Sequence, residues 1–128
     1  MEIFLITPPN EQNNFWEETI KLTTPTASTI SISANNWFSE MQASNNIDSK
    51  IVIIINMKSL LKEPGFIDYM KLHNISVICI DEDFHKLEPE EIMGMGIKAL
   101  ANKHVSVERI GELIRIVNNG GVYIETTK

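Results

Sequence analysis

Segments with the hydrophobic period of strands and of helices alternate along the whole chain. Five segments have the pattern of strands: residues 2–6, 27–33, 51–55, 75–80 and 97–101. Residues 51–55 are continuously apolar and β-branched, which is typical of a strand buried on both faces of a parallel sheet, and we assign residues 75–80 to a second strand of this kind. Residues 27–33 instead alternate between polar and apolar positions, which predicts a strand at the edge of the sheet.

Between the strands the apolar residues have helical spacing. The first expected helix covers residues 10–22, and the second is a short helix that is capped by Asn35 or Asn36 and ends at Ala43. The third covers residues 59–72, with an interruption near Pro64-Gly65. A fourth helix is expected to begin at Pro89 and stop at Gly94 or Gly96, and a fifth to begin at Ser106 and end at Gly120-Gly121. In the third helix, four residues are expected to face inward: Phe66, Tyr69, Met70 and Leu72. Residues 122–124 are expected to form a short extended tail.

Five strands that alternate with five helices predict an α/β fold with a mostly parallel central sheet. We expect a flavodoxin-like (βα)5 doubly wound parallel sheet with strand order 2-1-3-4-5, formed by residues 1–128 as a single domain. Functional sites in such folds lie at the carboxyl ends of the strands. The residues there are Thr7, Pro8, Asn56, Asp81 and the segment around Lys103.

Charge and composition exclude several classes of function. The 17 acidic and 11 basic residues give a net charge of −6, which repels nucleic-acid backbones and anionic membrane surfaces. The longest purely apolar run, residues 51–55, is far shorter than the ~20 residues of a membrane span. The N-terminus has no basic region ahead of its apolar stretch and therefore does not resemble a signal peptide. We expect a cytoplasmic protein that does not contact a membrane.

Candidate catalytic and metal-binding residues are few. The three histidines, His73, His85 and His104, lie in different loops without metal-ligand spacing, so we expect no metal. Cys79 lies inside an apolar strand and is expected to be a buried hydrophobic residue rather than a nucleophile. No glycine-rich loop follows the first strand, which argues against a nucleotide site, and we expect no cofactor. Asp81 is the one acidic residue placed to line a functional cleft.

The C-terminal third has the detailed pattern of a known family. It reads Gly96-Ile-Lys-Ala-Leu-Ala-Asn-Lys103, then Ser106 and a helix, then Gly120-Gly-Val-Tyr123. This pattern resembles the receiver domains of two-component response regulators and is most similar to the N-terminal domains of NarL/LuxR-type transcription regulators. The likeness covers the whole chain as a five-fold βα pattern and reaches motif level over residues 94–124.

The resemblance implies a phosphoryl-acceptor site from which this sequence departs. In that family an aspartate ending the third strand accepts phosphate, and a carboxylate pair after the first strand holds Mg²⁺. Here Asn56 ends the third strand and Thr7-Pro8 takes the place of the pair. No aspartate occurs between Lys50 and Glu63, so a small error in the strand boundary does not restore the acceptor.

The remaining receiver positions are only partly kept. Lys103 matches the family's lysine at the end of the fifth strand. Asp81 stands where a serine or threonine is expected, and Leu100 replaces the aromatic residue that often acts as a switch. We expect Asp81 and Lys103 to form an ion pair that takes the place of the phosphate contact.

These features predict a phosphorylation-independent pseudo-receiver that acts through dimerisation or a small-molecule effector. We expect no DNA-binding helix-turn-helix domain within this sequence; the family places that domain after a linker, close to where this sequence stops, so DNA contact would need a separate domain. The resemblance also implies a homodimer, for which we expect interface residues among Phe15, Trp16 and Ile116, with one residue of the aromatic pair pointing outward.

Two alternatives stay open at this stage. The first belongs to a different functional class: a small flavodoxin-like enzyme or ligand-binding protein whose site would contain Asn56, Asp81 and Lys103. The second is an ordinary receiver that accepts phosphate from acetyl phosphate.

Overall fold

A computed structural model describes most of the chain. The described residues are 2–8, 13–43, 50–56, 58–63, 65–81, 94, 96–102 and 104–125. They form the strands β1 (Glu2–Ile6), β2 (Ser28–Ile32), β3 (Lys50–Ile55), β4 (Ser76–Asp81), β5 (Ile97–Asn102) and β6 (Tyr123–Ile124). The helices are α1 (Asn13–Thr23), α2 (Trp37–Ala43), α3 (Phe66–Leu72) and α5 (Val107–Asn118), with short 3-10 turns at Ala34–Asn36 and Lys58–Lys62. The helix expected to begin at Pro89 lies outside the described residues.

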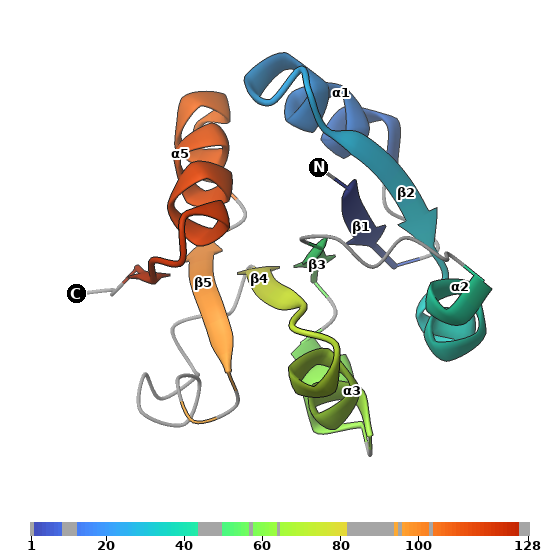
Figure 1. Cartoon of the computed structure of the whole chain (residues 1–128). Coiled ribbons are helices and arrows are strands. Elements are labelled where there is room, and N and C mark those ends of the chain that lie inside the picture. Colours follow the sequence, from blue (N-terminus) through green and yellow to red (C-terminus); the bar gives the residue numbers. More distant parts are fainter. Residues whose placement is uncertain are drawn as a thin grey trace.

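The six described strands form one parallel sheet in the order β2-β1-β3-β4-β5-β6. Order 2-1-3-4-5 confirms the flavodoxin-like fold. The C-terminal tail is extended, as expected, but its pairing was not predicted: Ala99 pairs with Tyr123 and Leu100 with Ile124, so β6 borders β5 at the end of the sheet. In Figure 1 the last strand, drawn in red, accordingly lies beside β5, whereas β2 forms the opposite border.

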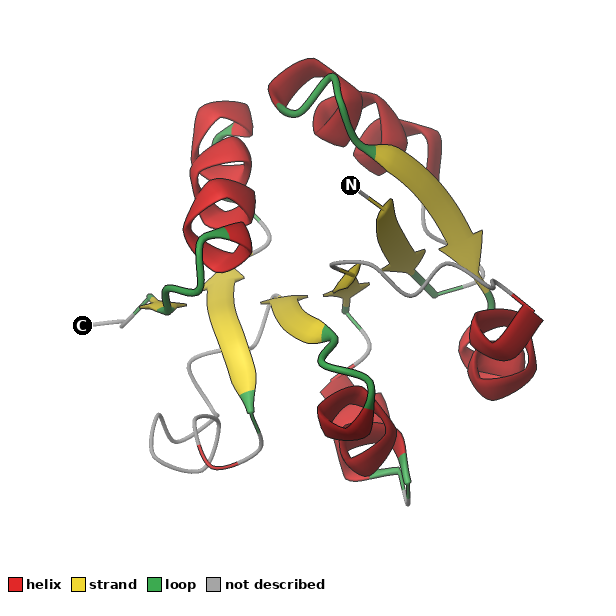
Figure 2. Ribbon diagram, in the orientation of Figure 1, coloured by secondary structure: helices red, strands yellow, loops and turns green. Residues whose placement is uncertain are grey.

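Helices cover both faces of the sheet, and each face has its own core. Figure 2 shows α1 and α5 on one side and α2 and α3 on the other. Successive residues of a strand point to opposite faces, so the all-apolar run in β3 supplies both cores. Ile51, Ile53 and Ile55 pack with α1 and α5, and Val52 and Ile54 pack with α2 and α3. This is the two-sided burial that the run predicted.

The last helix begins and ends as its local sequence predicts. Ser106 is the N-cap, and its hydroxyl accepts a hydrogen bond from the Arg109 N–H at 3.2 Å. At the other end Gly120 has φ of +86°, a left-handed conformation that glycine adopts without steric cost. The N–H of Gly121 then donates to the Ile116 carbonyl at 2.8 Å, which completes a Schellman motif.

One core prediction was wrong. Leu72 was expected to face inward, but its side chain is 77% exposed. Phe66 and Met70, four positions apart on α3, face the sheet and are buried. A residue two positions after Met70 is turned about 200° around a helix of 3.6 residues per turn, so Leu72 points to the opposite side.

No described helix is long and apolar enough to cross a membrane.

Candidate functional site

The topology brings three of the expected site residues to one edge of the sheet. Thr7 follows β1 directly, Asn56 follows β3, and Asp81 is the last residue of β4. The strands are parallel, and Ile6 of β1 lies beside Ile54 of β3, while Ile55 of β3 lies beside Ile80 of β4. Thr7, Asn56 and Asp81 therefore share the carboxyl edge, as expected for a site in this fold.

Asn56 turns the chain sharply at the end of β3. Its φ of +52° is left-handed, a conformation in which asparagine is enriched among non-glycine residues. Its N–H donates to the Ile80 carbonyl at 2.9 Å, which fixes this turn against the end of β4. A carboxamide is a neutral group that neither attacks phosphorus nor supplies charge to a divalent cation, so Asn56 can position neighbours but cannot act as a phosphoryl acceptor.

Thr7 and Asp81 are nearly inaccessible to solvent. Thr7 is 8% exposed and Asp81 is 5% exposed, and both interact with neighbouring groups in the fold. A buried carboxylate requires such partners, because an isolated buried charge is very costly. Among the described residues, no group of three or more histidine, cysteine, aspartate or glutamate side chains is placed to hold a metal ion. Pro8, next to Thr7, has no side-chain ligand atom at all.

Asn102, the last residue of β5, stabilises the turn that follows the strand, and the sequence analysis did not single it out. Asn102 pairs in register with Asp81, and its side-chain oxygen accepts a hydrogen bond from the His104 N–H at 2.8 Å. Its carbonyl also accepts from the Val105 N–H at 3.1 Å. An asparagine that bonds the backbone two residues later is a known turn former, so the signal was present in the sequence. Lys103 lies outside the described residues, and its ion pair with Asp81 stays a prediction.

Leu100 is part of the core. It is 1% exposed and packs on the α2 and α3 side of the sheet. Its carbonyl accepts a hydrogen bond from the Glu125 N–H at 2.9 Å, so β6 and the residue after it are tied to this point of β5. Because its side chain is aliphatic and buried in the core, Leu100 does not match the aromatic switch residue of the receiver family.

Of the two adjacent aromatic residues on α1, one is exposed and the other is buried, as expected. Phe15 is 52% exposed, whereas Trp16 is 4% exposed and packs in the core with α5. The two rings meet edge to face, with centroids 5.1 Å apart. Trp16 was among the expected interface residues, and its burial corrects that assignment, because adjacent helical residues differ by about 100° in direction. Ile116 is partly exposed and lies against Gly121.

Cysteine and histidine positions agree with the sequence analysis where the structure describes them. Cys79 is completely buried in β4. His73 and His104 are exposed and lie on different elements, whereas His85 lies outside the described residues. The rings of His73 and Tyr69 pack against each other with a tilt of 40° and centroids 4.3 Å apart.

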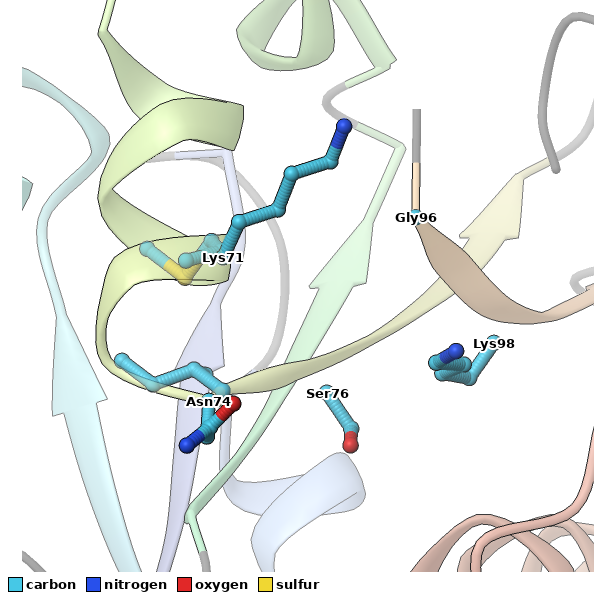
Figure 3. Close-up of a pocket in the computed structure, with 7 residues that line it drawn as sticks. Lys71, Asn74, Ser76, Gly96 and Lys98 are labelled. Atoms are coloured by element: carbon cyan, nitrogen blue, oxygen red, sulfur yellow. The ribbon is translucent and has the colours of Figure 1, made fainter. Parts of the chain in front are cut away.

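A cleft lies at the opposite, amino-terminal edge of the sheet. It measures about 450 Å³, and its described lining residues are Met70, Lys71, Asn74, Ile75, Ser76, Gly96 and Lys98. They come from α3, from the turn that connects α3 to β4, and from the first residues of β4 and β5 with the glycine before β5 (Figure 3). Lys98 lies in an irregularity of β5, where Val77 pairs with Ile97 but Ile78 pairs with Ala99. The Lys71 ammonium donates to the Gly94 carbonyl at 3.4 Å.

This cleft was not predicted from the sequence, because its lining comes from three separate elements. Two lysines and no acidic side chain are among its described lining residues, so its electrostatics favour an anionic group over a cationic one. Both lysines are exposed, and water screens them.

Comparison with known proteins supports the fold. A scan of protein-family models found no match to the sequence, and a search of curated proteins found none either. Among solved structures, the chain is similar to the crystal structure of a LuxR family DNA-binding response regulator from Silicibacter pomeroyi. The two align with a TM-score of 0.73 over 98% of this chain and 97% of that chain, at 9% sequence identity. At that identity the likeness shows the fold alone.

Proposed function

We propose that this chain is a receiver-like regulatory domain that works without phosphorylation, as part of a NarL/LuxR-type transcription regulator. Its strand order and its likeness in fold to a LuxR family response regulator support the receiver assignment. The motif-level resemblance of residues 94–124 supports it independently of the fold.

The observation that supports phosphorylation independence is the residue at the end of β3. The receiver mechanism needs a carboxylate there, because its oxygen attacks the phosphorus of the donor and forms the aspartyl phosphate. Asn56 occupies this place, and the hydrogen bond from its N–H to the Ile80 carbonyl holds it beside the end of β4. Residues 50–56 contain no carboxylate that could substitute for it.

The positions that would bind Mg²⁺ in a receiver support the same conclusion. Mg²⁺ prefers octahedral oxygen coordination with carboxylates among its ligands, and it neutralises the charge of the transferring phosphoryl group. Thr7 is a buried hydroxyl residue and Pro8 has no side-chain ligand atom, so this segment supplies no negative charge. Asp81 adds a buried carboxylate where the phosphoryl oxygens would lie, and like charges repel.

A domain of this kind must be controlled by something other than an aspartyl phosphate. We assign that role to self-association or to a small-molecule effector in the cytoplasm, with DNA contacted through a separate domain. The net charge of −6 fits a domain that does not itself bind DNA.

Phosphotransfer tests this proposal directly. The protein is incubated with Mg²⁺ and acetyl phosphate and its intact mass is measured, beside a receiver that retains the full acidic set as positive control. We expect no phosphoryl adduct on the wild-type chain. Asn56→Asp is the matched variant: an adduct on this variant alone would trace the loss of phosphorylation to this position. A stoichiometric adduct on the wild type overturns the proposal, and its persistence or loss in Asp81→Ala identifies the acceptor.

The same samples distinguish the alternative of a flavodoxin-like enzyme or ligand-binding protein. Native mass spectrometry of the freshly purified chain reveals any small molecule that stays bound. Such a molecule would favour the alternative, for which the basic cleft beside Lys71 and Lys98 is the supporting observation.

A further inference from the structure

Strand β2 forms a border of the described sheet, and among the described strands it pairs with β1 alone. The pairing is parallel and unbroken, from Glu2 beside Ser28 to Ile6 beside Ile32. In a parallel ladder the N–H and C=O of alternate residues point to one side. About half of the backbone groups of β2 therefore point away from β1.

Within the described strand, this border lacks charge, proline and bulges, three features that commonly prevent strands from pairing further. Proteins protect edge strands with charged side chains, prolines, bulges or a covering element. The strand reads Ser-Thr-Ile-Ser-Ile, with no charge and no proline, and its register with β1 shows no bulge. Ser28, Ile30 and Ser31 are exposed, Ile30 to 36%.

The surroundings of β2 in the sequence are also free of charge. Residues 22–39 are 18 consecutive positions without an aspartate, glutamate, lysine, arginine or histidine, in a chain whose net charge is −6. Two of the glutamates that flank this stretch are engaged within the chain: Glu17 accepts a hydrogen bond from the Ser31 hydroxyl, and Glu40 accepts from the Ser33 N–H at 2.7 Å. Because the Ser31 side chain projects from a face of the sheet, Glu17 lies over that face and not along the outer border.

We propose that β2 is a self-association surface, on which β2 of a second copy pairs antiparallel about a two-fold axis. The inference deepens the proposed function, on which it rests for its biological purpose, by naming the surface through which the domain dimerises. A two-fold axis perpendicular to the sheet reverses strand direction, so such an axis pairs one strand with itself in the antiparallel orientation. The two sheets then join into one, and the outward backbone groups of both strands find partners.

Charge and geometry favour a second copy over other occupants. Two acidic copies repel each other wherever charged faces meet, and the uncharged border offers the contact with the least repulsion. Ile30 is the central residue of β2 and shares a face with Ile32, which packs in the core with Trp37. In the paired arrangement the two copies of Ile30 lie close to the axis and shield each other from water.

Sedimentation velocity over a concentration series tests the proposal with three lysine variants. Ile30→Lys and Ser28→Lys place like charges on the paired border, and we expect each to raise the dimer dissociation constant about tenfold or more. Leu72→Lys is the matched control, an apolar-to-lysine change at a side chain that is 77% exposed on α3. We expect it to leave the dissociation constant unchanged. Thermal unfolding verifies that all three variants fold.

Ionic strength and cross-linking give independent readouts. Dimerisation through an uncharged border should strengthen as salt rises from about 0.05 to about 0.5 M, because screening weakens the repulsion between acidic copies. Single cysteines placed along β2 should form intermolecular disulfides most readily at the residue nearest the axis, while the native Cys79 is completely buried.

The outcomes separate this inference from the proposed function. A wild-type chain that stays monomeric up to its solubility limit overturns the inference. A dimer that persists in both Ile30→Lys and Ser28→Lys, or that weakens with salt, also overturns it. Either result leaves the phosphotransfer test of the proposed function unaffected, because that test does not depend on the oligomeric state.

Discussion

The contact between α1 and α5 depends on the absence of a side chain at Gly111. A β-carbon added there would lie 2.8 Å from the Cβ of Thr23 and 3.3 Å from its Cγ2. Carbon atoms in favourable contact are about 3.5–4.0 Å apart, so Gly111→Ala requires the helices to separate by about 1 Å at this point. Gly111 is buried in the middle of α5, where little free space is available to absorb the change.

Two opposing terms determine the effect of Gly111→Ala on the free energy of unfolding. Alanine is favoured over glycine in a helix interior by about 1 kcal/mol. Overpacking in a close-packed contact costs about 1–3 kcal/mol. The net expectation is a destabilisation of about 1 kcal/mol, within a range of about 0–2 kcal/mol.

A double-mutant cycle with Thr23→Gly isolates the packing term. Thr23 is the last residue of α1, and removing its side chain leaves space for a methyl group at position 111. In the Thr23→Gly background, Gly111→Ala should stabilise the protein by about 0.5–1 kcal/mol, because only the helix-propensity gain remains. The difference between the two backgrounds gives a coupling energy of about 1–3 kcal/mol.

Urea unfolding followed by tryptophan fluorescence is the assay. Trp16 and Trp37 are both buried, on opposite faces of the sheet, so their emission reports the loss of both cores. The reasoning is refuted if Gly111→Ala stabilises the wild-type chain, or if the cycle shows no coupling between the two positions.

Two further predictions concern the ends of α5. Ser106→Ala removes the acceptor of the Arg109 N–H and should lower the free energy of unfolding by about 1 kcal/mol, measured by urea denaturation; an unchanged midpoint would contradict the capping role. Gly120→Ala forces a β-carbon into a left-handed conformation and should cost about 1–2 kcal/mol, seen as a lower midpoint in thermal unfolding, whereas a stability gain would show that this turn can relax.

Much of the candidate site could be placed from the sequence, because the end of a buried strand is visible in one dimension. Apolar runs of the right length predict where β1, β3 and β4 end, and parallel topology then assigns Thr7, Asn56 and Asp81 to one edge. The hydrogen bonds that connect these strand ends were not predictable from the sequence. The hydrogen bond between the Asn56 N–H and the Ile80 carbonyl depends on strand register, which is set by packing between elements.

The sequence by itself determined the features that depend on local chemistry and on two-sided burial. A serine cap and a glycine stop act within a few residues, so both ends of α5 followed from the sequence around Ser106 and Gly120. The uninterrupted β-branched run in β3 identifies a central strand, since only burial on both faces makes such a run favourable.

Tertiary structure alone decided the features that depend on what each element packs against. The period of a short helix leaves its orientation uncertain, so only the packed structure showed that Trp16 enters the core while Phe15 and Leu72 point outward. The pairing of β6 with β5 and the cleft at the amino-terminal edge join segments that are distant along the chain. Local propensity contains no information about such contacts, because their stability comes from burying surfaces that meet only after the sheet has formed.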